Sequence, residues 1–199
     1  MAIAVFHNCG CIFYHITKCG GKSIRAMLGD EEVYYSGGCC AIPARLQQLW
    51  SFAAVRNPFD RFVSSWHFAL QQGRTNIQNP LAYLKWVLDN DLTIYGENWA
   101  SLQDNKLWCK THTAPMTTPR FRVHLADHIV RFENFEKDMR EVCKKVGVPY
   151  KAKHINASKH KPWPVYYKEW PGLEHEIQRW FAEDFATLKY PAKVSAYKC

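Results

Sequence analysis

The chain has 199 residues, of which 47% are hydrophobic and 15% aromatic, so it can bury a sizeable core, and its length does not require a second domain. The formal net charge of +8 favours acidic partners, such as phosphorylated or sulfated ligands, nucleic acid or an anionic surface. No signal peptide or membrane-spanning run is visible in the sequence, so we expect one cytoplasmic domain over residues 1–199.

The eight cysteines are expected to be reduced thiols, because a chain of this size without an export signal is not typical of disulfide-stabilised proteins. The pairs Cys9/Cys11 and Cys39/Cys40 lack the two-residue spacing of zinc knuckles, and no matched second pair follows them. We therefore expect no bound metal.

Strand, loop and helix patterns follow one another along the chain. The first comprises the apolar run "CIFYHI" (11–16), a loop with two glycines and a helix over "SIRAMLG" (23–29). The second comprises "LWSFAAV" (49–55) and a helix for which Asn57 is the N-cap and Pro58 the first residue.

The third pattern is a strand over "HIVRF" (128–132) and a helix over residues 133–147 that Gly147 ends, and residues 173–190 show the same helical spacing. The apolar positions of these last two helices are Phe135, Met139, Val142, Cys143 and Val146, and Leu173, Ile177, Phe181, Phe185 and Leu188. This alternation predicts a three-layer α/β fold, in which a mainly parallel central sheet is flanked by helices on both faces. The loops after the first two strands would then lie at the same edge of the sheet.

The loop of residues 18–23 is suited to an anion. Two glycines expose backbone N–H groups at the start of a helix, Lys18 and Lys22 add positive charge, and Ser23 adds a hydroxyl. A nucleoside-triphosphate loop would need a glycine five positions before Gly21, where this chain has the β-branched Ile16. The loop therefore predicts a site for a phosphate-like group that does not depend on a metal ion.

A second anion site is predicted after the second strand. Arg56 ends that strand and Ser64 lies eight residues later in the helix, so a guanidinium and a hydroxyl can converge on another phosphate, with Arg61 as a third candidate donor. In the alternative interpretation, Arg56 caps its strand and pairs with Asp60. Two anion sites on adjacent strand and helix units predict a nucleotide that carries phosphates at both ends.

The same segments resemble two motifs of the membrane-type carbohydrate sulfotransferases, a sulfotransferase family 2-like group. "FYHITKCGGKSIRAML" is similar to their 5′-phosphosulfate loop, whose usual form is close to His-Ile-Pro-Lys-Thr-Gly-Gly-Thr-Ser, although Thr17 and Lys22 depart from it. "AVRNPFDRFVSSW" is similar to their 3′-phosphate motif, which is built on Arg-Asp/Glu-Pro. The segments "NWASLQ", "DHIVRFENFEKDM" and "LEHEIQRWFAEDFATLKY" resemble later elements of that family in the same order.

The resemblance implies a nucleotide-loop (P-loop-like) sulfotransferase fold. It also implies transfer of a sulfuryl group from 3′-phosphoadenosine 5′-phosphosulfate (PAPS) to a hydroxyl or amine of a glycan or small-molecule acceptor. Nucleic acid is not an expected partner. By match to the motifs, Lys18 lies at the bridging oxygen and is catalytic. The implied nucleotide-binding residues are Lys18, Cys19, Gly20, Gly21, Lys22, Ser23, Arg56, Ser64 and Lys161.

The general base is left open by the sequence. Many relatives place a histidine or glutamate between the two phosphate motifs, where this chain has "YYSGGCCAIP", so that Cys39 or Cys40 takes the matching position. The other candidates are His67, which follows the serine motif and is our catalytic candidate, His112, Glu31 and Glu32.

Two other functional classes stay open. A phosphotransferase would need a magnesium ligand and would have to tolerate Ile16. A non-catalytic binder of sulfated glycans or nucleic acid would need the basic surface but would not need Lys18 at a bridging position. The aromatic-rich segment of residues 71–122 is expected to form the acceptor wall, and its composition does not identify the acceptor.

Overall fold

The computed structural model describes residues 2–29, 31–35, 43–88, 104–118, 121, 123–152 and 160–197. The chain divides into two compact units, Met1–Arg56 with Thr118–Ala157 and Asn57–Thr117 with Ser158–Cys199, and each unit is described by itself. The assignment of residues 1–199 to a single domain stays a prediction.

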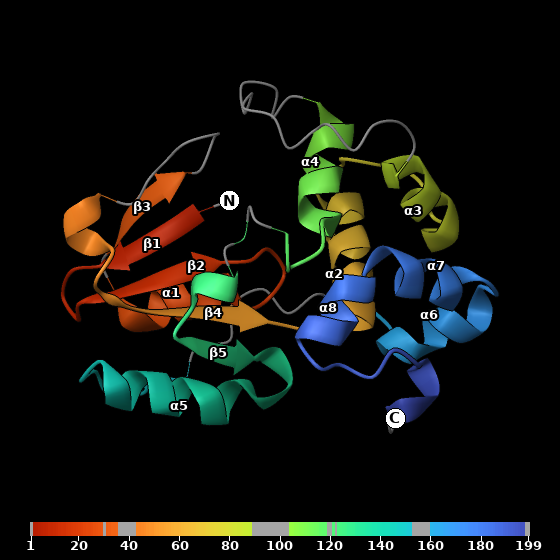
Figure 1. Cartoon of the computed structure of the whole chain (residues 1–199). Coiled ribbons are helices and arrows are strands. Elements are labelled where there is room, and N and C mark those ends of the chain that lie inside the picture. Colours follow the sequence, from red (N-terminus) through yellow and green to blue (C-terminus); the bar gives the residue numbers. More distant parts are fainter. Residues whose placement is uncertain are drawn as a thin grey trace. The chain divides into compact units, whose positions relative to one another are not determined.

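The first unit contains a five-stranded sheet with the strand order β3-β1-β2-β4-β5 (Figure 1). Its strands are β1 (Ala2–Phe6), β2 (Cys11–His15), β3 (Glu32–Tyr35), β4 (Trp50–Val55) and β5 (His128–Arg131). The neighbours β2, β4 and β5 pair in parallel, as expected for strand, loop and helix units. Strand β1 pairs antiparallel with both β2 and β3, so the sheet is mixed, and the expected mainly parallel sheet is not confirmed.

The antiparallel pairing follows from the short connection between β1 and β2. Only the turn of residues 7–10 joins them, and Gly10 adopts a φ of 62° in it. A connection of this length can join only antiparallel strands, because a parallel crossover needs a dozen or more residues. The sequence interpretation did not assign "AIAVF" to a strand and therefore missed this hairpin.

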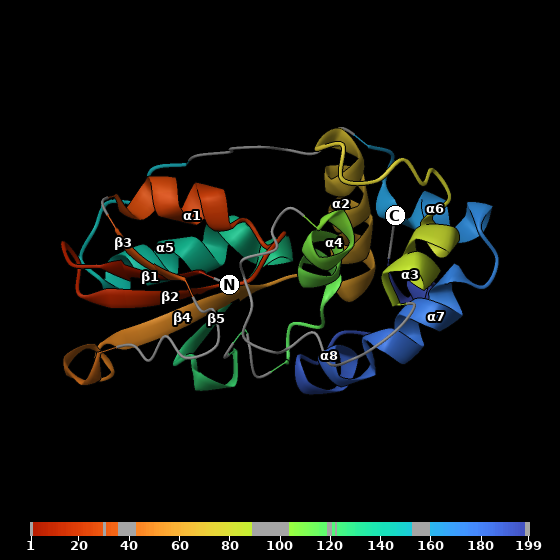
Figure 2. The same ribbon diagram turned by 90° about the horizontal axis from the view of Figure 1, so that it is seen from above.

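Helices α1 (Gly21–Leu28) and α5 (Phe135–Lys145) lie on the same face of this sheet (Figure 2). They contact one another where the Cys143 Sγ lies 3.7 Å from the Met27 Sδ. The predicted apolar face of α5 is confirmed at the buried Met139, Val142 and Cys143. The prediction of helices on both faces, and so of three layers, stays a prediction.

Both units also contain short 3₁₀ helices. They are η1 (Ala44–Leu46), η5 (Val123–Leu125) and η6 (Phe132–Asn134) in the first unit, and η7 (Val194–Ala196) in the second. Because η6 occupies the segment directly after β5, α5 begins at Phe135, two residues later than the sequence predicts.

The described part of the second unit is helical. Its helices are α2 (Pro58–Gln71), α3 (Pro80–Leu88), α4 (Asn105–Thr113), α6 (Trp163–Glu169), α7 (Leu173–Trp180) and α8 (Ala182–Thr187). Helix α2 packs against α3, α4, α6 and α7 and is buried along most of its length. The predicted cap is confirmed, because the Asn57 Oδ1 accepts a hydrogen bond of 2.9 Å from the Phe59 N–H, and Pro58 begins the helix.

The C-terminal apolar positions are buried as predicted, at Leu173, Ile177, Phe181, Phe185 and Leu188. The helix is nevertheless interrupted at Phe181, whose φ of −104° separates α7 from α8. None of the helices in the described residues is long and apolar enough to cross a membrane.

Candidate nucleotide-binding site

The parallel pairing of β2 with β4 brings the two predicted anion loops of the first unit together. Tyr14 of β2 pairs with Ala53 of β4, so the carboxyl ends of both strands lie at the same edge of the sheet. The segment before α1 follows β2, and Arg56 follows β4. The Arg56 Nη1 donates a hydrogen bond of 3.2 Å to the carbonyl oxygen of Lys18. The expectation that both loops lie at one edge is confirmed.

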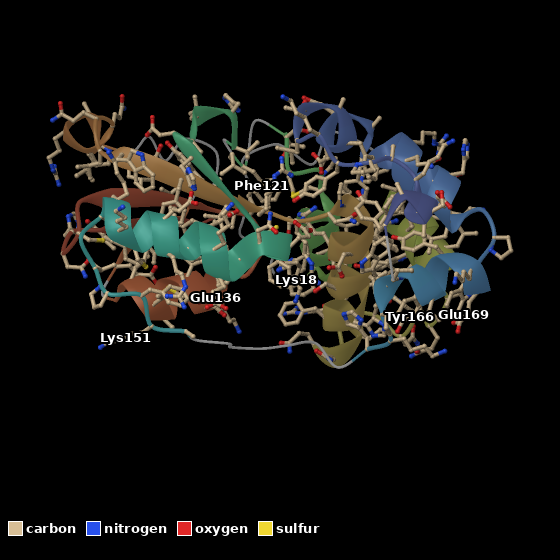
Figure 3. The ribbon with its side chains drawn as sticks, turned by 90° about the horizontal axis from the view of Figure 1, so that it is seen from below. Lys18, Phe121, Glu136, Lys151, Tyr166 and Glu169 are labelled. Atoms are coloured by element: carbon tan, nitrogen blue, oxygen red, sulfur yellow. The ribbon has the colours of Figure 1, made fainter. Side chains whose placement is uncertain are left out.

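The loop before α1 has an unusual backbone. Lys18 has a φ of 67°, and Gly20, the N-cap of α1, has a φ of 80°. The left-handed region costs a non-glycine residue about 1 kcal/mol, so a lysine held there is a feature that often marks a functional loop. Figure 3 labels Lys18 in this loop.

The N-terminus of α1 is arranged to favour an anion. The N–H groups of Gly21 and Lys22 come before the first internal hydrogen bonds of the helix, and the N-cap Gly20 has no side chain that could accept from them. The Ser23 N–H is used within the helix, because it donates to the Gly20 carbonyl at 3.0 Å. The helix therefore leaves the N–H groups of Gly21 and Lys22 as the donors at its start, without the N–H group of Ser23. Ile16 is fully buried at the position where a nucleoside-triphosphate loop would need glycine.

A third strand end contributes an aromatic pair that the sequence interpretation missed. The Arg56 guanidinium lies 4.2 Å from the centre of the Phe132 ring, which follows β5. A Cβ at Gly20 would lie 3.0 Å from the Phe135 Cε2 and 3.3 Å from the Phe132 Cδ2. Gly20 is therefore required both by its backbone conformation and by the rings packed against it. The signal in the sequence was the run "HIVRFENF", in which both phenylalanines follow a strand end.

His15, at the end of β2, is a further residue of this region. Burial, and then the charge of Arg25, lower the pKa of the His15 imidazole to about 4. The ring is therefore neutral at neutral pH. No role had been assigned to it, although it begins the matched motif "HITKCGGKS".

The second unit holds Ser64 and Arg61 on α2. Arg61 is fully buried and donates to the carbonyl oxygens of Ala114 and His112, at 2.8 and 3.4 Å. The prediction that Arg61 is a third phosphate donor is wrong, because its guanidinium is used to hold the end of α4. Ser64 is 2% exposed. Its joint binding of a 3′-phosphate with Arg56, which belongs to the first unit, stays a prediction.

The buried charge of Arg61 is matched within the second unit by Asp184, which is also fully buried. The Asp184 carboxylate accepts hydrogen bonds of 2.8 Å from the N–H groups of Met116 and Thr117 and from the Thr117 hydroxyl. Burial raises the pKa of Asp184, and the Arg61 charge opposes that rise. Arg61 thus binds carbonyl groups at the end of α4, and Asp184 binds amide groups of the segment that follows it.

His67, the catalytic candidate, lies on α2 next to α6. Its Nε2 lies 2.7 Å from the hydroxyl of Tyr166, a residue labelled in Figure 3, and its ring stacks on His160 with centres 4.9 Å apart. Burial, and then the nearby His160, lower the pKa of His67 to about 4. His67 is thus a neutral imidazole in a polar contact, and its role as a base stays a prediction.

The other candidate bases are engaged in separate contacts. The His112 Nδ1 lies 2.8 Å from the Trp108 carbonyl oxygen, and the two rings stack with centres 3.8 Å apart. Glu31 pairs with Arg25. Glu32 lies 2.8 Å from His7, and Cys39 and Cys40 lie outside the described residues. None of the described residues among these other candidates is singled out by its surroundings.

Lys161, the predicted late basic residue, lies before α6. Its Nζ lies 2.7 Å from the Glu169 Oε1, and 60% of its side chain is exposed (Figure 3 labels Glu169). An exposed pair of this kind contributes little to stability and exchanges readily for another partner. The nucleotide-binding role of Lys161 stays a prediction.

Among the described residues, Cys9, Cys11, Cys19, Cys109 and Cys143 form no disulfide. No group of three or more His, Cys, Asp or Glu side chains among the described residues could hold a metal ion. The cytoplasmic assignment stays a prediction.

A family model described as "Sulfotransferase family" matches residues 40–191, which is more than half of the chain. The chain belongs to the sulfotransferase family. The match includes β4, Arg56, α2 and β5, and it begins after the loop of residues 18–23. The assignment of that loop therefore depends on its own geometry. No curated protein and no solved structure matches this sulfotransferase. The resemblance is confirmed at the level of the family, and the carbohydrate-specific, membrane-type subgroup stays a prediction.

Proposed function

We propose that this sulfotransferase uses PAPS as its donor and transfers the sulfuryl group to a hydroxyl or amine of a glycan or small molecule. Membership of the family supports sulfuryl transfer in general. One observation carries the choice of donor. The Lys18 loop, the N-terminus of α1 and Arg56 meet at one edge of the sheet, and a hydrogen bond of 3.2 Å from Arg56 to the Lys18 carbonyl joins them.

The residues at this edge fit a nucleotide with phosphates at two positions. The N–H groups at the start of α1 and the Lys22 ammonium favour a 5′-phosphate, because the helix N-terminus carries a partial positive charge. Arg56 can present a planar set of donors to a 3′-phosphate, to which we also assign Ser64. This division of roles explains why the two predicted loops each carry their own positive charge.

Lys18 has the role most specific to transfer. The bond between sulfur and the bridging oxygen breaks as the acceptor oxygen or nitrogen bonds to sulfur, and 3′,5′-ADP leaves. Negative charge then grows on the bridging oxygen, and an ammonium directed at it stabilises the transition state more than the ground state. We assign this ammonium to Lys18.

The acceptor must lose a proton during transfer, and we assign its removal to His67. Because its pKa is lowered to about 4, the His67 imidazole is neutral at neutral pH and can accept a proton, and the same shift makes it a weaker base than an ordinary histidine. The proton passes from the acceptor hydroxyl to the imidazole, while the leaving nucleotide keeps both of its phosphates. The contact of His67 with Tyr166 fixes the orientation of the ring.

The experiment is a transfer assay with radiolabelled PAPS and a panel of sugars, phenols and amines. Labelled product together with release of 3′,5′-ADP in equal amount would support the proposal. If the nucleotide binds but no acceptor in the panel is labelled and no 3′,5′-ADP is released, the protein is a non-catalytic binder and the proposal is wrong.

A further inference from the structure

The imidazole of His15 occupies the space that a side chain at position 21 would need. A Cβ built on Gly21 would lie 2.1 Å from the His15 Nε2, 2.2 Å from its Cδ2 and 2.9 Å from its Cε1. All three distances are too short for real contacts, so a residue other than glycine at position 21 requires the ring to move. His15 and Gly21 are therefore a pair matched in size.

A column of stacked aromatic rings packs against the His15 ring. His15 stacks on Phe13 with centres 5.5 Å apart, Phe13 stacks on Phe52 at 5.0 Å, and Phe52 stacks on Trp50 at 5.7 Å. Phe13 and Phe52 are fully buried and belong to the neighbouring strands β2 and β4. Displacing His15 would disturb the packing of this column of rings, and close-packed protein interiors resist such changes.

We propose that His15 is a positioning residue for the donor nucleotide, because its ring sets the position of the Gly21 backbone at the start of α1. This inference depends on the proposed function, since the N–H groups of Gly21 and Lys22 are the ones assigned to the 5′-phosphate. A site held in place before the ligand arrives binds it without the cost of ordering the loop. His15 therefore contacts both the Phe13 ring, which belongs to the stacked column of β2 and β4, and the start of the nucleotide loop helix at Gly21.

The contribution of His15 is steric. Burial, with the charges of Arg25 and Lys22, keeps the imidazole neutral at neutral pH, so it adds no positive charge to the anion site. Removing the ring should thus affect nucleotide binding because the Gly21 backbone can shift, and not because a charge is lost. This distinction makes a test by size compensation possible.

The test combines the variants Gly21→Ala and His15→Ala, singly and together, and measures the affinity for 3′,5′-ADP by calorimetry. Gly21→Ala should weaken binding tenfold or more, on the order of the loss expected from overpacking. Adding His15→Ala should make room for the new methyl group, so the double variant should bind within about threefold of His15→Ala alone. Thermal unfolding without nucleotide should show the same compensation.

Gly147→Ala is the matched control. Gly147 also belongs to the first unit, but a Cβ there would meet nothing within 4 Å, and its φ of 72° makes the cost conformational. Gly147→Ala should lower stability, and His15→Ala should not relieve that loss.

The outcomes separate this inference from the proposed function. If the wild-type protein binds 3′,5′-ADP and the effects of the two variants on affinity are additive, the positioning role is wrong while the donor assignment stands. If unfolding shows compensation but the wild-type protein does not bind 3′,5′-ADP, the proposed function is wrong, and the positioning role falls with it. Compensation in both measurements, with weaker 3′,5′-ADP binding by His15→Ala alone, supports the inference, and unchanged binding by His15→Ala alone would contradict it.

Discussion

Arg56 is expected to act on the fold and on the nucleotide, and its replacement can separate these two effects. In the structure it donates to the Lys18 carbonyl at 3.2 Å and lies 4.2 Å from the centre of the Phe132 ring. Arg56→Ala removes both contacts together with the charge assigned to the 3′-phosphate. Arg56→Gln is the matched variant, because its amide can still donate a hydrogen bond but carries no charge.

The expected magnitudes follow from these contacts. A hydrogen bond from a charged donor contributes about 1.5–3 kcal/mol, and a partly exposed cation–π contact about 0.5–1 kcal/mol. Because Arg56 is partly exposed, we expect Arg56→Ala to lower the free energy of unfolding by about 1–3 kcal/mol. Loss of the charged donors to the phosphate should weaken 3′,5′-ADP binding by roughly 2–4 kcal/mol, which is about 30-fold to 1,000-fold.

The assay is calorimetric titration of each variant with 3′,5′-ADP and with 5′-AMP, beside urea unfolding. Binding of 5′-AMP should fall only a few-fold with Arg56→Ala, because this nucleotide lacks the 3′-phosphate and senses Arg56 only through the Lys18 loop. Arg56→Gln should be closer to the wild-type protein in stability but should still lose 3′,5′-ADP affinity. Equal losses for both nucleotides would show that Arg56 acts on the fold alone.

Two further predictions follow from the same edge of the sheet. Lys18→Ala should lower turnover on the order of a hundredfold while 3′,5′-ADP affinity stays within a few-fold, and Lys22→Ala should cost more affinity than turnover. Wild-type turnover in the Lys18 variant would refute the assigned role. Because the pKa of His15 is about 4 in the folded protein against 6.5 for an ordinary histidine, only the unfolded chain takes up this proton as the pH falls from 6.5 to 4. Stability should therefore fall in this window by up to about 1.4 kcal/mol per pH unit, and urea unfolding of His15→Asn beside the wild-type protein should show that the slope attributable to this residue is lost.

The elements that the sequence predicts correctly are those with local signals. Asn57 and Pro58 mark the start of α2, and the apolar spacing of Met139, Val142 and Cys143 marks the buried face of α5. These signals involve neighbours in the chain and do not depend on the tertiary fold. Strand β1 was missed because a run of five apolar residues has no comparable marker, and its pairing is decided by the turn that follows.

The same distinction applies to the candidate site. Lys18 and Arg56 were expected at one edge because parallel neighbours align their carboxyl ends, and the structure places them in contact. The contacts of Phe132 with Gly20 and with Arg56 join residues far apart in sequence, so the run "HIVRFENF" indicates two phenylalanines near a strand end but not the residues that they contact. Arg61 was assigned incorrectly because the complete burial of its side chain depends on the packing of α2 against α4.

Titration of the wild-type protein with 3′,5′-ADP, with 5′-AMP and with ATP plus Mg²⁺ tests most directly whether this sulfotransferase binds a nucleotide phosphorylated at both ends. We expect 3′,5′-ADP to bind at least about tenfold more tightly than 5′-AMP, and to do so without Mg²⁺, because Arg56 adds charged donors to the loop of α1. Tighter binding of ATP with Mg²⁺, or no preference for the nucleotide with the 3′-phosphate, would contradict the assignment of PAPS as the donor.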